Sequence, residues 1–146
     1  MANELPVRGT ESGTIYVLRS LSEHPYIMQH RDLIHKIGVT RGDVKTRISN
    51  ARADPTFLFA EVEVVATYKL FDINRSKLEG LLHRVFSTSR LDLEIKDRFD
   101  RPVRPREWFL VPLHVIDQVV ERVRDQSIAE YSYDLLQARL VKLEHP

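Results

Sequence analysis

Hydrophobic and polar residues alternate most regularly between Phe59 and Leu70. Apolar side chains occupy every second position from Val62 onward, charged or polar side chains fill most positions between them, and only Val65 interrupts the pattern. A period of two residues is typical of a strand that buries one face and exposes the other. The pattern therefore predicts a strand in this segment.

Three further segments are short and rich in β-branched and aromatic residues, namely Gly13–Leu18, Leu33–Val39 and Trp108–Val111. This composition favours strands. The first two segments are close enough in sequence to pair in antiparallel orientation.

Helical spacing of apolar residues predicts two helices between these strands. Asp43 is a suitable N-cap for the first, and Asp54-Pro55 is expected to end it. Its apolar stripe consists of Val44, Ile48 and Ala51. Asp72 or Asn74 is expected to cap the second helix, whose apolar face consists of Leu78, Leu81, Leu82 and Val85.

Two closing helices are predicted after Pro112. The first carries Val115, Ile116, Val119, Val120 and Val123 on one face, and the second runs from Ile128 to Leu140. The segment from Ser87 to Pro105 is expected to be a long polar loop that contacts a substrate. The order β-β-α-β-α-β-α-α indicates a single mixed α/β domain.

Composition narrows the functional class. The chain has 146 residues and no cysteine, which excludes disulfides, thiolate zinc sites and cysteine nucleophiles. No apolar run approaches the roughly 20 residues that span a bilayer, and the start has no signal-peptide pattern, so we expect a cytoplasmic protein with no membrane partner.

Positive charge is concentrated in two segments, although the net charge is only +1. Residues 31–52 contain six Lys or Arg against two Asp, and residues 96–106 contain five against two. These segments could form a phosphate-binding face. A solvated surface of mixed charge is the alternative interpretation.

Five short motifs occur in order along the chain. They are Gly13-Thr14-Ile15-Tyr16, His35-Lys36-Ile37-Gly38, Arg47 nine positions after Gly38, Glu79 followed four positions later by His83, and Arg106-Glu107-Trp108-Phe109. In combination they resemble the GIY-YIG nuclease superfamily, in particular its branch of phage proteins and fungal meiotically up-regulated proteins. In that branch a tyrosine stands where this chain has His35.

The resemblance implies a small, mainly antiparallel three-stranded sheet flanked by helices. It implies a lead-in over 1–12, a nuclease domain over 13–111 and a C-terminal helical extension over 112–146. The implied activity is metal-dependent endonuclease cleavage of phosphodiester bonds in nucleic acid, in DNA in preference to RNA. Magnesium (Mg2+) would be the cofactor, with manganese (Mn2+) as a substitute.

Four residues are the catalytic candidates. Tyr16 would act as the general base or orient it, His35 would assist proton transfer, Arg47 would bind the phosphate and Glu79 would bind the metal. The planar guanidinium of Arg47 suits two phosphoryl oxygens, and magnesium is commonly held by one or two carboxylates. Further substrate-binding candidates are Lys36, Arg41, Arg52 and His83.

Each candidate has a simpler structural interpretation. Tyr16 and His35 could be core residues, Arg47 could form a surface salt bridge, and Glu79 could be a solvated carboxylate. A catalytically impaired nucleic-acid-binding or scaffold module is therefore the rival function. A third possibility is that the closing helices form a homodimer contact.

Overall fold

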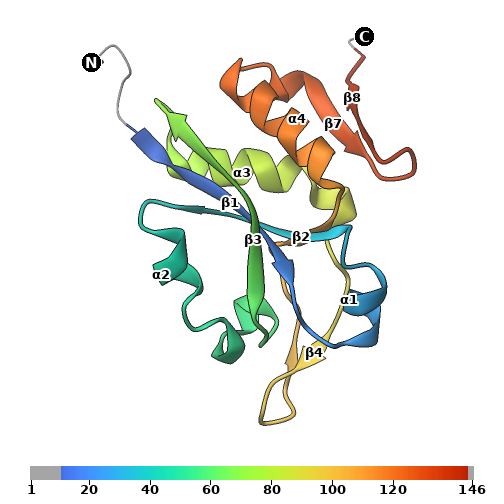
Figure 1. Cartoon of the computed structure of the whole chain (residues 1–146). Helices are drawn as coiled ribbons and strands as arrows, with labels where there is room; N and C mark the ends of the chain where they lie inside the picture. The colour runs from blue at the N-terminus through green and yellow to red at the C-terminus, as the bar shows by residue number, and fades with distance from the viewer. Residues whose placement is uncertain (1–10, 145–146) are drawn as a thin grey trace.

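The structure is a computed structural model that describes residues 11–144. Its centre is a four-stranded antiparallel sheet in the order β3-β1-β2-β6 (Figure 1). The strands are β1 (Glu11–Ser20), β2 (Ile34–Thr40), β3 (Val62–Phe71) and β6 (Trp108–Leu110). The predicted strands and the antiparallel pairing of the first two are confirmed, although the sheet has four strands rather than three. The predicted lead-in over 1–12 lies almost wholly outside the described residues.

One face of the sheet is covered by two helices, α3 (Arg75–Val85) and α4 (Leu113–Arg124). Asn74 caps α3 by accepting a hydrogen bond from the backbone N–H of Lys77. The predicted stripe of α4 is buried in full and packs, with the α3 stripe, against Ile15, Val17 and Ile37 of the sheet. This aliphatic cluster is the main core of the protein.

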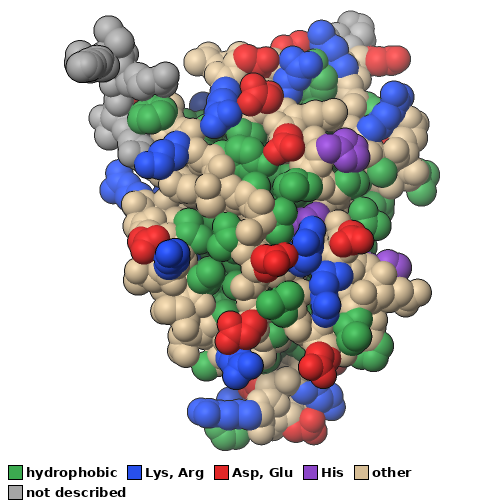
Figure 2. All heavy atoms as spheres, viewed as in Figure 1, with side chains coloured by type: hydrophobic (Ala, Val, Ile, Leu, Met, Phe, Trp, Pro, Cys, Tyr) green, Lys and Arg blue, Asp and Glu red, His purple; other side chains and the backbone are tan. Residues whose placement is uncertain are grey.

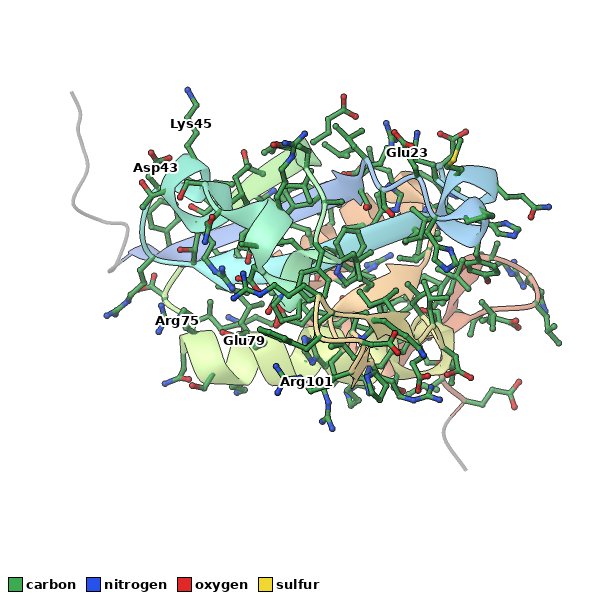
Figure 3. The ribbon with its side chains drawn as sticks, turned by 90° about the horizontal axis from the view of Figure 1, so that it is seen from below. Glu23, Asp43, Lys45, Arg75, Glu79 and Arg101 are labelled. Atoms are coloured by element: carbon green, nitrogen blue, oxygen red, sulfur yellow. The ribbon has the colours of Figure 1, made fainter. Side chains whose placement is uncertain are left out.

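Shorter elements cover the opposite face: α1 (Pro25–Gln29), α2 (Val44–Ile48) and two 3-10 turns, η1 (Ala51–Ala53) and η2 (Pro55–Phe57). Figure 3 shows α2 and α3 on opposite sides of the strands. The single helix predicted between Asp43 and Asp54 is therefore divided into α2 and the turn η1. Thr46 and Ser49 favour short turns over helix, and the Ser49 hydroxyl donates to the Thr46 carbonyl where α2 ends.

The segment predicted as a long loop contains its own structure. A 3-10 turn, η3 (Ser87–Ser89), is followed by a small hairpin of β4 (Ile95–Lys96) and β5 (Pro102–Val103). Leu93 and Ile95 pack against a second cluster that includes Leu91 and Trp108. The base of the hairpin is thereby fixed to the body of the protein.

The second closing helix is not present, and the prediction of helix from Ile128 to Leu140 is wrong. The segment forms a turn, η4 (Ile128–Glu130), and a hairpin of β7 (Tyr131–Asp134) and β8 (Arg139–Lys142). Positive φ angles at Gln126 and Ala138 interrupt a helix on both sides. One of the two helices that were expected to form a homodimer contact is therefore absent from this segment.

No helix in the described part of the chain has the length and apolar character needed to cross a membrane.

Candidate functional site

Tyr16 occupies the middle of β1 on the face opposite α3 and α4. It is 1% exposed and packs with Leu18, Ala51 and Phe57. Its partner in β2 is Gly38. A Cβ atom at Gly38 would lie 2.4 Å from both the Tyr16 hydroxyl oxygen and its ring carbon Cζ. The glycine is therefore required because the tyrosine ring lies directly on the neighbouring strand.

Lys36 lies on the same face and is fully buried. Its Nζ forms an ion pair with Glu107 and lies 5.4 Å from the ring centroid of Phe57 and 5.9 Å from that of Tyr16. Burial lowers the pKa of the Lys36 ammonium below its ordinary value, and the carboxylate of Glu107 opposes that change. The structure does not favour the predicted substrate-binding role of Lys36, because its ammonium is paired with Glu107 and has no exposed surface.

Arg47 extends from α2 over this face. Its guanidinium carbon lies 5.0 Å from the ring centroid of Phe57, and Phe57 packs with Tyr16. Burial raises the pKa of Tyr16 above its ordinary value of 10.0, although Arg47 acts in the opposite direction. A phenol with a raised pKa is neutral near pH 7, so it is suited to orienting a partner rather than to removing a proton.

Glu79 and His83 lie on α3, a helix that contacts β2. β6 pairs with Ile34–Lys36 of β2. Glu79 is exposed, and Figure 3 shows it on the side of α3 that faces the strands. Its charge contributes to the raised pKa of Tyr16.

His83 is half-buried and its ring meets that of Phe109 edge-on, with centroids 5.7 Å apart. Burial lowers the pKa of the imidazole, while the charges of Glu107 and Glu79 oppose the change. The side chain is therefore a neutral imidazole near pH 7, close to both carboxylates.

Six residues are thus linked by contacts or by the effect of their charges on one another's pKa, and we call them the Tyr16 cluster: Tyr16, Lys36, Arg47, Glu79, His83 and Glu107. Glu107 had no role assigned from the sequence. The sequence feature that could have indicated Glu107 is the motif Arg106-Glu107-Trp108-Phe109. Its two aromatic residues are buried in the core, and Nε1–H of Trp108 donates to the Thr56 carbonyl over 2.9 Å. That anchoring fixes the carboxylate of Glu107 beside Lys36.

His35 is not part of the Tyr16 cluster. It points to the opposite face of β2, is fully buried, and its Nδ1 lies 2.7 Å from the Val111 carbonyl oxygen, within hydrogen-bond distance. Burial lowers the pKa of the imidazole, and the hydrogen bond to Val111 opposes that change. The structure therefore does not bring His35 to Tyr16, and we assign it no part in proton transfer.

The two other arginine candidates are exposed on the surface. Arg41 lies in the turn before α2, and Arg52 forms an ion pair with Glu61 over 3.1 Å. Arg104 similarly pairs with Asp92. Figure 2 shows positive and negative side chains mixed over the visible face. A basic face formed by the two positive segments is therefore not supported by this view.

The described residues contain no group of three or more His, Cys, Asp or Glu side chains arranged to hold a metal ion. Glu79 offers one exposed carboxylate. Magnesium is commonly bound through one or two carboxylates and keeps several waters. The donor chemistry of Glu79 is thus compatible with that ion.

The T5orf172 domain family model matches residues 13–124, a range that contains β2, β3, β6 and α4 and all of β1 except its first two residues. This match corrects the resemblance to the GIY-YIG superfamily, because the family found is a different one. T5orf172 domains are associated with nuclease-like and DNA-binding functions.

A curated protein of Bacillus subtilis (strain 168), "Uncharacterized protein YeeC", is 40% identical over 112 residues. The similarity covers 77% of this chain but 29% of the relative, so the chain spans less than a third of that protein. No solved structure gives a significant match.

Proposed function

Because the chain belongs to the T5orf172 domain family, we propose that it is a nuclease that hydrolyses phosphodiester bonds of DNA with the help of a divalent metal ion. The observation that carries the proposal is the Tyr16 cluster. Arg47 from α2 lies over Phe57, which packs with Tyr16. Glu79 comes from α3, far away in the sequence, yet its charge and that of Arg47 both influence the pKa of Tyr16.

The cluster contains the groups that phosphodiester hydrolysis requires. The reaction needs a cation on the phosphoryl oxygens, a means of activating water and a way to neutralise developing charge. Arg47 is exposed and has a planar fork of donors, so it would bind two oxygens of one phosphate. Its position is fixed by the Phe57 ring beneath it.

Glu79 would hold magnesium, or manganese in its place. The bound ion would supply positive charge to the phosphoryl oxygens. Glu107 is a weaker candidate ligand, because its carboxylate already forms the ion pair with buried Lys36.

The protein groups that would handle protons differ from those expected from the sequence. His83 is a neutral imidazole close to Glu79, so it would accept a proton from the attacking water. Tyr16 would orient that water or Arg47 through its hydroxyl, since its raised pKa disfavours the phenolate.

A nucleic-acid-binding module without cleavage is the second candidate function. The observation that favours it is the burial of Tyr16, whose 1% exposure leaves little surface for direct contact with a substrate. In that case Arg47 would bind phosphate, and Glu79 would have no role in turnover.

A cleavage assay distinguishes the two functions. Labelled single-stranded and double-stranded DNA and RNA would be incubated with the protein in magnesium, in manganese and in EDTA. We expect cleavage of DNA that EDTA abolishes. Glu79→Ala should lose cleavage by about 100-fold or more and should unfold at the wild-type temperature, because Glu79 is exposed.

The matched control is Glu23→Ala, an exposed glutamate that Figure 3 shows on the opposite side of the molecule. It should leave cleavage unchanged. If wild type binds DNA but cleaves no substrate with either metal, the binding module is the correct function. If Glu79→Ala cleaves as well as Glu23→Ala, the metal site is elsewhere.

A further inference from the structure

The hairpin formed by β4 and β5 presents an aromatic residue to solvent at its tip. Phe99 is 62% exposed. The guanidinium carbons of Arg98 and Arg101 lie 4.9 Å and 4.8 Å from its ring centroid. Figure 1 shows the hairpin projecting at the end of the molecule away from both termini, and Figure 2 shows hydrophobic, positive and negative side chains together at that end.

The tip is held in one conformation by the carboxylate of Asp97. One oxygen accepts the backbone N–H groups of Phe99 (2.8 Å) and Arg101 (2.9 Å), and the other accepts Nε–H of Arg101 (3.1 Å). Asp100 closes the turn with a positive φ of 63° and donates its N–H to the Asp97 carbonyl. An exposed aromatic ring on a fixed support loses little conformational entropy when it binds a partner.

The base of the hairpin is anchored on the same face of the sheet as the Tyr16 cluster. Ile95 packs with Ile34 and Trp108, and Ile34 lies on the Lys36 side of β2. Only three residues separate Val103, the end of β5, from Glu107. A molecule bound along this face would therefore meet both the cluster and the hairpin.

We infer that the hairpin tip binds unpaired nucleotides of the nucleic-acid substrate, with a base stacked on Phe99 and with Arg98 and Arg101 contacting the adjacent phosphates. The inference rests on the proposed nucleic-acid function, and it adds that the substrate contains unpaired nucleotides. Aromatic side chains stack on the exposed face of a base, whereas bases inside a duplex offer their faces only to each other. Arginine is suited both to the aromatic ring in the free protein and to phosphate in the complex.

The experiment measures binding in EDTA, so that it does not depend on cleavage. Fluorescence anisotropy would follow a fluorescein-labelled single strand of about 20 nucleotides and the duplex of the same strand at one salt concentration. Phe99→Ala should weaken binding of the single strand by about 5- to 100-fold, which corresponds to the usual contribution of one stacked base. Phe99→Trp should retain the affinity, because a second aromatic ring can stack.

The matched control is Leu136→Ala, which removes a hydrophobic side chain that is 97% exposed on another part of the surface. It should bind both oligonucleotides as wild type does. The inference is overturned if Phe99→Ala binds the single strand like Leu136→Ala, or if it weakens the duplex and the single strand equally. A wild-type protein that binds the single strand through Phe99 but cleaves no DNA would leave this inference intact and overturn the proposed nuclease activity.

Discussion

His35 and Lys36 are neighbours in β2, yet their side chains lie on opposite faces of the sheet, and both are fully buried. His35 is beneath the helices, where its imidazole is within hydrogen-bond distance of the Val111 carbonyl. Lys36 is beneath short turns, where its ammonium pairs with a carboxylate among aromatic rings. The same strand therefore contributes to two quite different environments.

The helical face is built for stability. Its side chains are mostly aliphatic or aromatic, and α3 and α4 pack against them in the main core. The opposite face combines Tyr16, Lys36 and Arg47 with a thin cover of α2, η1 and η2. A buried ion pair contributes little net stability, since desolvation offsets the attraction. The difference indicates that one face supports the fold and the other holds chemical groups in position.

Among the substitutions that test the difference between the two faces, one that creates a cavity in the helical face is expected to have the largest effect on stability. Ile116→Ala in α4 should lower the free energy of unfolding by about 2–5 kcal/mol, because Ile116 is 1% exposed in the main core. Urea denaturation would measure the loss, and the cleavage rate of the folded fraction should be unchanged. The exposed neighbour Gln118→Ala is the control on the same helix. A rate that falls together with stability would show that the two faces are not independent.

A substitution on the opposite face, Gly38→Ala, is expected to have a smaller effect on stability and a larger effect on cleavage. In Gly38→Ala the new methyl group would overlap the Tyr16 ring, which is too buried to move freely. We expect a stability loss of about 1–3 kcal/mol together with loss of cleavage, because the Tyr16 ring and its hydroxyl would be displaced.

The control for this substitution is Gly80→Ala in α3, where a Cβ would meet nothing within 4 Å. It should stabilise the protein by about 0.5–1 kcal/mol and leave cleavage intact. Full cleavage by Gly38→Ala would exclude a requirement for the position of Tyr16.

The smallest expected effect is the pH dependence contributed by His35. Its pKa in the folded protein is lowered by burial, so the unfolded chain binds a proton more readily. The stabilisation is complete above the unfolded pKa of about 6.5 and is lost as the pH falls from there through the folded pKa. Chemical denaturation between neutral and mildly acidic pH would reveal this loss.

His35→Asn should be less stable at neutral pH and should lose stability less steeply on acidification than wild type. Substitution of an exposed histidine in the same way, His114→Asn, should keep the wild-type slope. Equal slopes in all three proteins would contradict the assignment of a buried neutral imidazole. Because His35 lies outside the Tyr16 cluster, folded His35→Asn molecules should cleave at the wild-type rate.

Local patterns in the sequence were sufficient for most of the secondary structure. Alternation predicted β3, β-branched and aromatic composition predicted β1 and β2, and helical spacing after Asp72 or Asn74 as the cap predicted α3. These patterns reflect interactions between residues only a few positions apart. The same reasoning failed from Ile128 to Leu140, where apolar spacing fitted both a helix and the observed hairpin, and positive φ angles at Gln126 and Ala138 were not recognisable beforehand.

The sequence also determined which residue types were available for a site, including Tyr16, Arg47, Glu79 and His83. Tertiary structure alone decided which of them meet. The register of β1 and β2 sets Tyr16 opposite Gly38, so Lys36 shares its face and His35 does not. Glu107 joins the cluster because β6 pairs with β2. Register and strand order depend on the packing of the whole sheet, and a shift of one residue would exchange the two faces.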